Sequence, residues 1–202
     1  MIKIENENIL LVEGKDDKRF FYAAIKFFNF TDIQVESYDG KDNFKNKIEV
    51  FTKKTPGWNK VSSLGIIRDA NDNPKGAFQS VIDALKALDL PTPEEPMKVA
   101  PGIPKVSIMI VPAIDKQGEL EDMCLESLIN DPSLPCINQY FSCLNNSKIE
   151  IPIKEAKAKI QAFLASRKDP SKRLGEAAEA QYFNFDDEAF LHVKYFLRKL
   201  YL

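Results

Sequence analysis

Three short apolar runs, separated by amphipathic segments, constrain the fold more than any other feature of the chain. The runs are NILLV at 8–12, VSSLGII at 61–67 and VSIMIV at 106–111. Strands that are apolar on both faces are typical of parallel sheets covered by helices on both sides. KDDKRFFYAAIKFF follows the first run and PKGAFQSVIDALKAL follows the second, each with apolar residues at helical spacing. The sequence therefore predicts an α/β fold with a mostly parallel sheet.

The remaining segments complete this expected organisation. DIQVESY at 32–38 alternates like a further strand, MKVA at 97–100 fits a short edge strand in a proline-rich loop, and a helix is expected over 119–129. After residue 131 the pattern is helical only, in INQYFSCL, KEAKAKIQAFLAS, SKRLGEAAEA and DDEAFLHVKYFLRKL. We therefore expect an α/β domain over 1–147 and a helical extension over 148–202 that packs on it.

Composition and charge restrict the kind of protein. The 202 residues include 28 Lys and Arg against 30 Asp and Glu, so no large basic excess indicates nucleic-acid binding by itself. No apolar run is long enough to span a membrane, and the acidic start MIKIENEN is unlike a signal peptide, so we expect a cytoplasmic protein without a membrane partner. Three cysteines without CxxC spacing and a single histidine argue against a disulfide framework and a structural zinc site.

Acidic residues follow several of the expected strands. Glu13 follows the run at 8–12 with Asp17 four residues later, Asp69 follows the run at 61–67, and Glu119 and Glu121 begin the helix after the run at 106–111. In open parallel sheets, ligands bind beyond the carboxyl ends of the strands. Carboxylates gathered there repel one another unless a cation neutralises them, and such hard oxygen ligands suit Mg²⁺ or Mn²⁺. The sequence therefore predicts a divalent-metal site.

Some of these acidic residues also have interpretations other than metal binding. Acidic residues in a first helical turn also stabilise the helix dipole, which is the reading we favour for Asp122 over support of a metal ligand. GKDD is not a phosphate-binding P-loop, because Ile9 replaces the first glycine and Asp16 replaces the Ser or Thr after the lysine. A receiver-like phosphoacceptor role for Asp69 is weaker, since no lysine clearly ends a fifth strand.

The motifs VEGKDD, IIRDAND and GELED together resemble a Toprim domain, the module shared by topoisomerases, primases, OLD-family nucleases and small ribonucleases. GELED and the helical tail are most similar to the OLD branch and its small standalone relatives. The resemblance implies a Toprim-like fold, Mg²⁺ or Mn²⁺ as cofactor, and Glu13 and Asp69 as catalytic residues. It implies that one ion is held by Glu13, Asp69 and Asn71 and a second by Asp17, Glu119 and Glu121. It also implies a late lysine, for which Lys157 and Lys159 both match.

The resemblance predicts metal-dependent phosphodiester hydrolysis on nucleic acid, DNA or RNA, with one departure. Asn71 stands where the D-x-D turn of the family has its second acid, and Asp72 follows it. Asparagine coordinates metals through its carbonyl oxygen without adding negative charge. The alternative is therefore a non-catalytic Toprim-like module that binds nucleic acid or protein and has a regulatory role.

Basic residues near the first motif are the expected contacts to the phosphate backbone. Lys15, Lys18 and Arg19 lie within six residues after Glu13 and are predicted to meet the scissile phosphate. The segment 41–60 adds six lysines and Trp58, which could stack on a base. Exposed helix lysines more often only solvate a surface, so this second patch is the weaker prediction.

Overall fold

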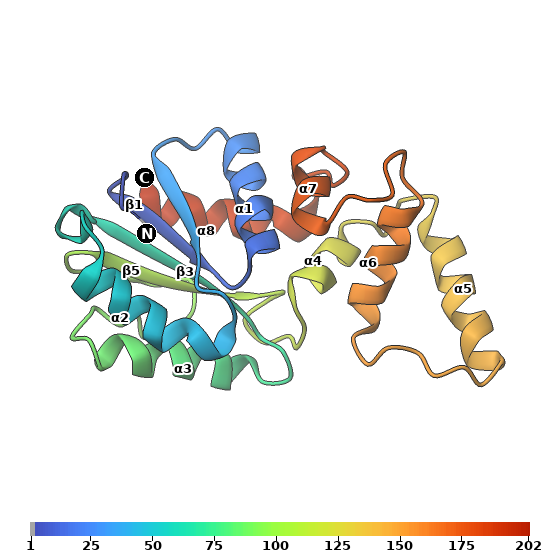
Figure 1. The fold of residues 1–202 in the computed structure, drawn as a ribbon, viewed down its shortest axis with the longest axis horizontal. Coiled ribbons are helices and arrows are strands. Elements are labelled where there is room, and N and C mark those ends of the chain that lie inside the picture. Colours follow the sequence, from blue (N-terminus) through green and yellow to red (C-terminus); the bar gives the residue numbers. More distant parts are fainter. Residues whose placement is uncertain (1–2) are drawn as a thin grey trace.

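The computed structural model describes residues 3–202, which form a five-stranded sheet with helices on both faces and a helical lobe at one end (Figure 1). The sheet order is β2-β1-β3-β5-β4. Four strands are parallel, and β4 pairs antiparallel with β5 at one edge, as expected for the MKVA segment. The strands are β1 (Asn8–Val12), β2 (Ile33–Ser37), β3 (Ser63–Asp69), β4 (Val99–Ala100) and β5 (Lys105–Val111).

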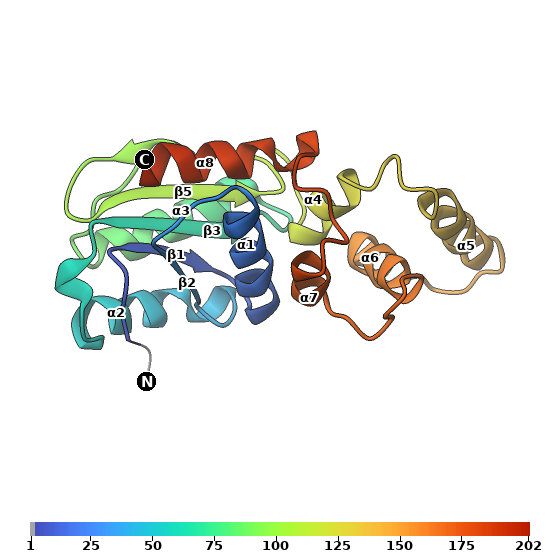
Figure 2. The same ribbon diagram turned by 90° about the horizontal axis from the view of Figure 1, so that it is seen from above.

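Helices cover the two faces of the sheet in pairs (Figure 2). One face packs against α1 (Lys15–Phe27) and α8 (Leu191–Tyr201), through a core that includes Phe20 and Phe196. The other face packs against α2 (Phe44–Lys54) and α3 (Pro74–Lys86), through Ile48 and Val81. Both faces of the central strands are therefore buried, as the continuous apolar runs predict.

The helical lobe comprises α4 (Leu120–Glu126), α5 (Leu134–Asn146), α6 (Glu155–Ala165) and α7 (Leu174–Glu179), and α5 lies farthest from the sheet (Figure 1). Helix α4 ends at Glu126, three residues before the end of the helix predicted over 119–129. Three short 3₁₀ helices, η1 (Lys41–Asn43), η2 (Trp58–Lys60) and η3 (Glu188–Phe190), lie in the connections. Within residues 3–202, no helix is both long and apolar enough to cross a membrane.

The end of the chain returns from the lobe to the sheet. Helix α8 packs on β3 and β5, and the Tyr201 hydroxyl donates a hydrogen bond of 2.7 Å to the Ile9 carbonyl. Helix α7 packs closely on α1, because a Cβ atom at Gly175 would lie only 2.6 Å from both the Asp16 carbonyl oxygen and the Arg19 Cβ. Residues after 147 therefore contribute to the lobe and also to the core of the sheet, while the division at 147/148 stays a prediction.

Candidate metal centre

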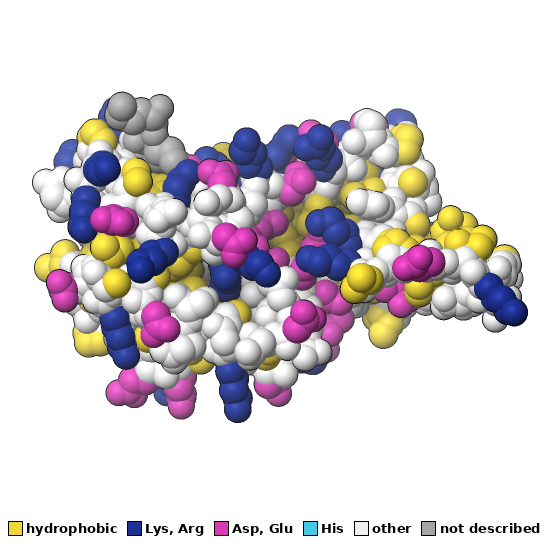
Figure 3. Space-filling view, turned by 60° about the horizontal axis from the view of Figure 1, so that its bottom comes forward, with side chains coloured by type: hydrophobic (Ala, Val, Ile, Leu, Met, Phe, Trp, Pro, Cys, Tyr) yellow, Lys and Arg dark blue, Asp and Glu magenta, His cyan; other side chains and the backbone are white. Residues whose placement is uncertain are grey.

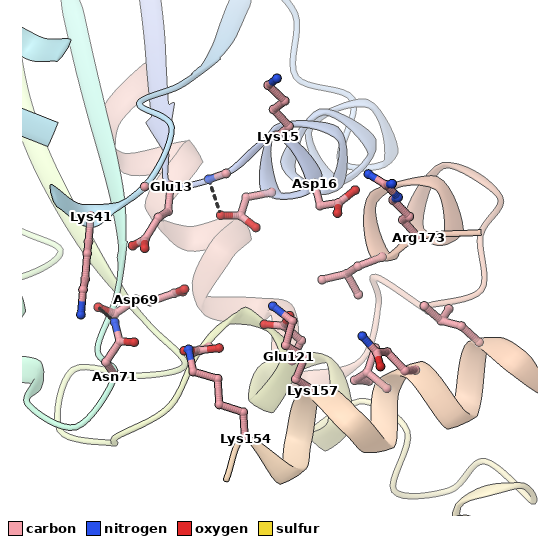
Figure 4. A pocket seen from close by; sticks show the side chains of 18 of the residues that line it. Glu13, Lys15, Asp16, Lys41, Asp69, Asn71, Glu121, Lys154, Lys157 and Arg173 are labelled. Carbon is pink, nitrogen blue, oxygen red and sulfur yellow. Dashed lines mark hydrogen bonds and ion pairs between the residues drawn. The ribbon is translucent and has the colours of Figure 1, made fainter. Parts of the chain in front are cut away.

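The six residues predicted to hold metal all line one cleft of about 1070 Å³ at the carboxyl end of the sheet. The loop after β1, the turn after β3 and the start of α4 meet there. Figure 4 shows the carboxylates of Glu13, Asp69 and Glu121 facing the interior of the cleft from three different segments. From outside, acidic and basic side chains lie close together around a hollow near the middle of one face (Figure 3). The six are Glu13, Asp17, Asp69, Asn71, Glu119 and Glu121.

The first two carboxylates lie in one turn of chain, and a local hydrogen bond fixes Asp17. Glu13 directly follows β1, and the Gly14 N–H donates to Asp17 Oδ2 at 2.7 Å, which caps the start of α1. An acidic residue in the first turn also interacts favourably with the helix dipole. One turn of chain therefore holds Glu13 and Asp17 at the same mouth of the cleft.

A short two-residue ladder joins the turn after β3 to the start of α4. The backbones of Asn71 and Gly118 exchange two hydrogen bonds of 2.8 Å, with Asn71 at a φ of 48°. Asparagine tolerates this left-handed conformation better than most residues. The ladder holds the start of α4, which follows Glu119, beside the turn after β3.

The two acids whose roles the sequence left open lie in different surroundings. Asp122 Oδ2 accepts a hydrogen bond of 2.7 Å from the Glu119 N–H, so it caps the start of α4, as we favoured. Asp72 is exposed, and its backbone carbonyl accepts a hydrogen bond from Gln117. Asn71, and not Asp72, is therefore the residue of this turn that lines the cleft.

Burial and mutual repulsion perturb two of the carboxyl groups. The pKa of Asp17 is raised to about 6, chiefly by burial and in smaller part by the charges of Glu121 and Glu13, which together outweigh the lowering effect of the Gly14 hydrogen bond. Burial also raises the pKa of Asp69 well above its ordinary value, with added repulsion from Asp17, Glu13, Glu121 and Glu119. The carboxylates at the strand ends are therefore close enough to repel one another electrostatically.

Arg68 is the buried cation behind this acidic cluster. It is 8 % exposed, its Nη1 donates to the Lys41 carbonyl at 3.2 Å, and it lies 3.9 Å from Glu13 Oε2. Both Glu13 Oε2 and Arg68 Nε are buried without a hydrogen-bond partner within the described chain. Arg68 thus offsets the charge of Glu13 but leaves one carboxylate oxygen free.

Replacing Arg68 tests this charge balance. Arg68→Met is expected to lower the free energy of unfolding by about 2 kcal/mol, because removing one partner leaves a buried charge uncompensated. Urea denaturation in EDTA measures the change. Lys45→Met, an exposed lysine at the start of α2, is the matched control and should change stability little. Equal stability of Arg68→Met and wild type would show that Arg68 does not compensate the cluster.

Two lysines, one in α6 and one directly before it, neutralise the acids at the start of α4. Lys154 forms a short ion pair with Glu119, and Lys157 Nζ lies 3.3 Å from Glu121 Oε1. These contacts raise the pKa of both lysines. Lys159 instead pairs with Glu155 at 2.8 Å. Of the two late lysines that the sequence left open, Lys157 is the one in the cleft.

The basic residues predicted to meet phosphate are distributed differently. Lys15 lines the cleft, although its side chain points away from the carboxylates (Figure 4). Lys18 pairs with Glu36 at 2.8 Å. Arg19 pairs with two glutamates of α7, Glu176 and Glu179. Their role in nucleic-acid binding stays a prediction.

Other cleft residues come from parts of the chain that the sequence analysis did not connect to the site. From the helical lobe they include Lys154, Lys172 and Arg173, and Lys41, one of the six lysines of 41–60, lines the cleft as well. The positively charged KEAKAK segment was the available signal for Lys154. Trp58, in contrast, packs on the hydrophobic core between the sheet and α2 and α3.

The carboxylate and amide oxygens that line the cleft are suitable ligands for a divalent cation. Within residues 3–202, no three His, Cys, Asp or Glu side chains form a tight cluster that could hold a metal as they stand. Nevertheless Glu13 Oε2 is buried without a partner, and Asp17 and Asp69 are half-buried among like charges. Hard cations bind such oxygen ligands and remove the repulsion between them.

Comparison with known proteins agrees with this architecture. A family model described as Protein of unknown function (DUF3226) matches residues 7–202. The chain belongs to this family. Among curated protein sequences, nothing matches it.

One solved structure has the same fold as this DUF3226 member. It is the C-terminal region of the Burkholderia pseudomallei OLD protein, which matches with a TM-score of 0.56 over 97 % of both chains at 13 % identity. The predicted fold class, Toprim-like α/β with a mostly parallel sheet, is confirmed. At this identity the likeness extends to the fold alone.

Proposed function

We propose that this DUF3226 member is a nuclease that hydrolyses phosphodiester bonds in nucleic acid with the help of Mg²⁺ or Mn²⁺. The observation that carries the proposal is the single cleft lined by acids from two strand ends and one helix start, with lysines beside them. The Toprim-like motifs and the likeness to an OLD protein region support it.

The chain's residues divide between ligands and charge compensation. In the proposed site, Glu13, Asp69 and Asn71 would hold one ion, and Asp17, Glu119 and Glu121 would surround a second. A bound divalent ion lowers the pKa of a coordinated water and stabilises negative charge on a phosphoryl oxygen. Lys154 and Lys157 would attract the phosphate, and their place on the α6 side of the cleft supports this role.

Cleavage assays with matched variants test the proposal. Single-stranded and duplex DNA and RNA are incubated with the protein in Mn²⁺, and cleavage is expected to disappear in EDTA. Glu13→Gln should reduce the rate about 100-fold, because a neutral amide is a poorer ligand for a hard cation. Asp72→Asn removes an exposed acid outside the cleft and should leave the rate unchanged. Undiminished cleavage by Glu13→Gln would refute the site.

The alternative function is a binding module without hydrolysis. It is favoured by Asn71, which lies in the cleft in place of a second acid of the β3 turn. Association with nucleic acid or protein that survives EDTA, with no cleavage in any metal, would support it. Restoring an acid with Asn71→Asp would then be expected to strengthen Mn²⁺ binding.

A further inference from the structure

The cleft has a second end that the metal site does not use. Beyond the acids it continues between α6 and α7, where it is lined by Ile160, Gln161, Leu164, Arg173 and Leu174. Figure 4 shows Arg173 at the far side of the cleft from Asp69 and Asn71. One end therefore offers carboxylates, and the other offers apolar surface with one cation and one amide.

The polar groups at this second end are available to a ligand. Gln161 is exposed, and its side chain makes no hydrogen bond within residues 3–202. Arg173 is exposed, and none of the ion pairs in the described chain involves its guanidinium. Neighbouring Lys172 is already paired with Asp169 at 3.1 Å. A free guanidinium in the same cleft as the acids suits a second phosphate of a bound strand.

The apolar groups suit a flat ligand surface. Ile160, Leu164 and Leu174 are held firmly by the core, at 2 %, 5 % and 8 % exposure, while still lining the cleft. The free amide of Gln161 on the same wall offers a donor and an acceptor together, which matches the polar edge of a nucleobase. The apolar surface, the amide and the cation thus match the face of a base, the edge of a base and a phosphate of one nucleotide.

We propose that this end of the cleft is a subsite for one unstacked nucleotide of a single strand, next to the phosphate at the acidic end. Arg173 binds its phosphate, Gln161 binds the edge of its base, and Ile160, Leu164 and Leu174 contact the face of the base. In a duplex, neighbouring bases cover that face, so the subsite selects single strands or extruded nucleotides. The inference rests on the proposed function and specifies its substrate class.

Binding measurements in EDTA test the subsite without cleavage. Fluorescence anisotropy compares a labelled single-stranded oligonucleotide, a blunt duplex of equal length and a fully abasic strand. Wild-type protein should bind the single strand about tenfold more tightly than either of the others. Equal affinity for the duplex, or for the abasic strand, would overturn the proposal, because the face of a base would then contribute nothing.

Surface variants locate the contact. Arg173→Ala should weaken single-strand binding about tenfold and lower the salt dependence, log Kd against log[salt], by about 0.7, the contribution of one phosphate contact. Gln161→Ala should weaken binding about threefold without changing the salt dependence. The controls are Lys168→Ala and Gln139→Ala, exposed residues of the lobe outside the cleft, which should bind as wild type.

The outcomes separate this inference from the proposed function. Cleavage in Mn²⁺ together with unchanged binding by Arg173→Ala would overturn the subsite and leave the nuclease intact. Arg173-dependent binding of single strands without cleavage in any metal would refute the nuclease and support the subsite in a binding module.

Discussion

Asp17→Asn is expected to raise the free energy of unfolding of the metal-free protein by about 3 kcal/mol at pH 7.5. The pKa of Asp17 is about 6 in the folded protein against 3.8 for an unperturbed Asp, and each pKa unit corresponds to about 1.4 kcal/mol. Asparagine keeps an oxygen that can accept the 2.7 Å hydrogen bond from the Gly14 N–H. The substitution therefore removes the half-buried charge and retains the helix cap.

The pH dependence has a definite sign. A carboxyl group with a raised pKa binds its proton more tightly in the folded state than in the unfolded state, so wild-type stability falls as the pH rises from about 4 through about 6. Asp69, whose pKa burial also raises, titrates jointly with Asp17 and adds to the same loss. Urea denaturation in EDTA at pH 4.5 and 7.5 should show the largest gain from Asp17→Asn at the higher pH.

Asp16→Asn is the matched control, since it removes the same charge from the same first turn of α1. Its expected effect is a small loss of stability, because an acid near a helix N-terminus is favourable by a few tenths of a kcal/mol. A loss of stability in Asp17→Asn at pH 7.5 would contradict the prediction, and so would an equal gain in both variants.

The sequence predicts the sheet and the acidic end of the cleft well for the same physical reason. The apolar runs at 8–12, 61–67 and 106–111 become β1, β3 and β5, because only strands buried on both faces tolerate such runs. Parallel strands end at one edge, so Glu13 and Asp69 meet although 56 positions separate them in the sequence. Topology alone thus brings the strand-end acids together.

The other half of the cleft depends on packing that no local pattern specifies. Arg173 reaches the site because α7 packs tightly on α1 at Gly175, and Lys154 reaches it because α6 packs on α4. Conversely, Lys18 and Arg19 are adjacent to the motif in sequence but leave the cleft. A helix turns about 100° per residue, so they point to Glu36 and to α7.

Mn²⁺ at 1,000 times its dissociation constant is expected to stabilise the wild-type protein by about 4 kcal/mol. A cation removes the repulsion among Glu13, Asp17 and Asp69 that the pKa shifts report. For a chain of 202 residues this corresponds to a rise in Tm of roughly 10 °C. Thermal denaturation followed by circular dichroism, with Mn²⁺ and with EDTA, measures the shift without any assay of activity.

The same experiment discriminates the site from general binding of Mn²⁺ to an acidic surface. Because the carboxyl groups must lose their protons to bind the metal, the rise in Tm should be larger at pH 7.5 than at pH 5. Asp69→Asn should remove most of the rise, whereas the exposed Asp72→Asn should retain it. A rise of equal size in both variants would place Mn²⁺ elsewhere on the protein and leave the acids at the strand ends without a metal-binding role.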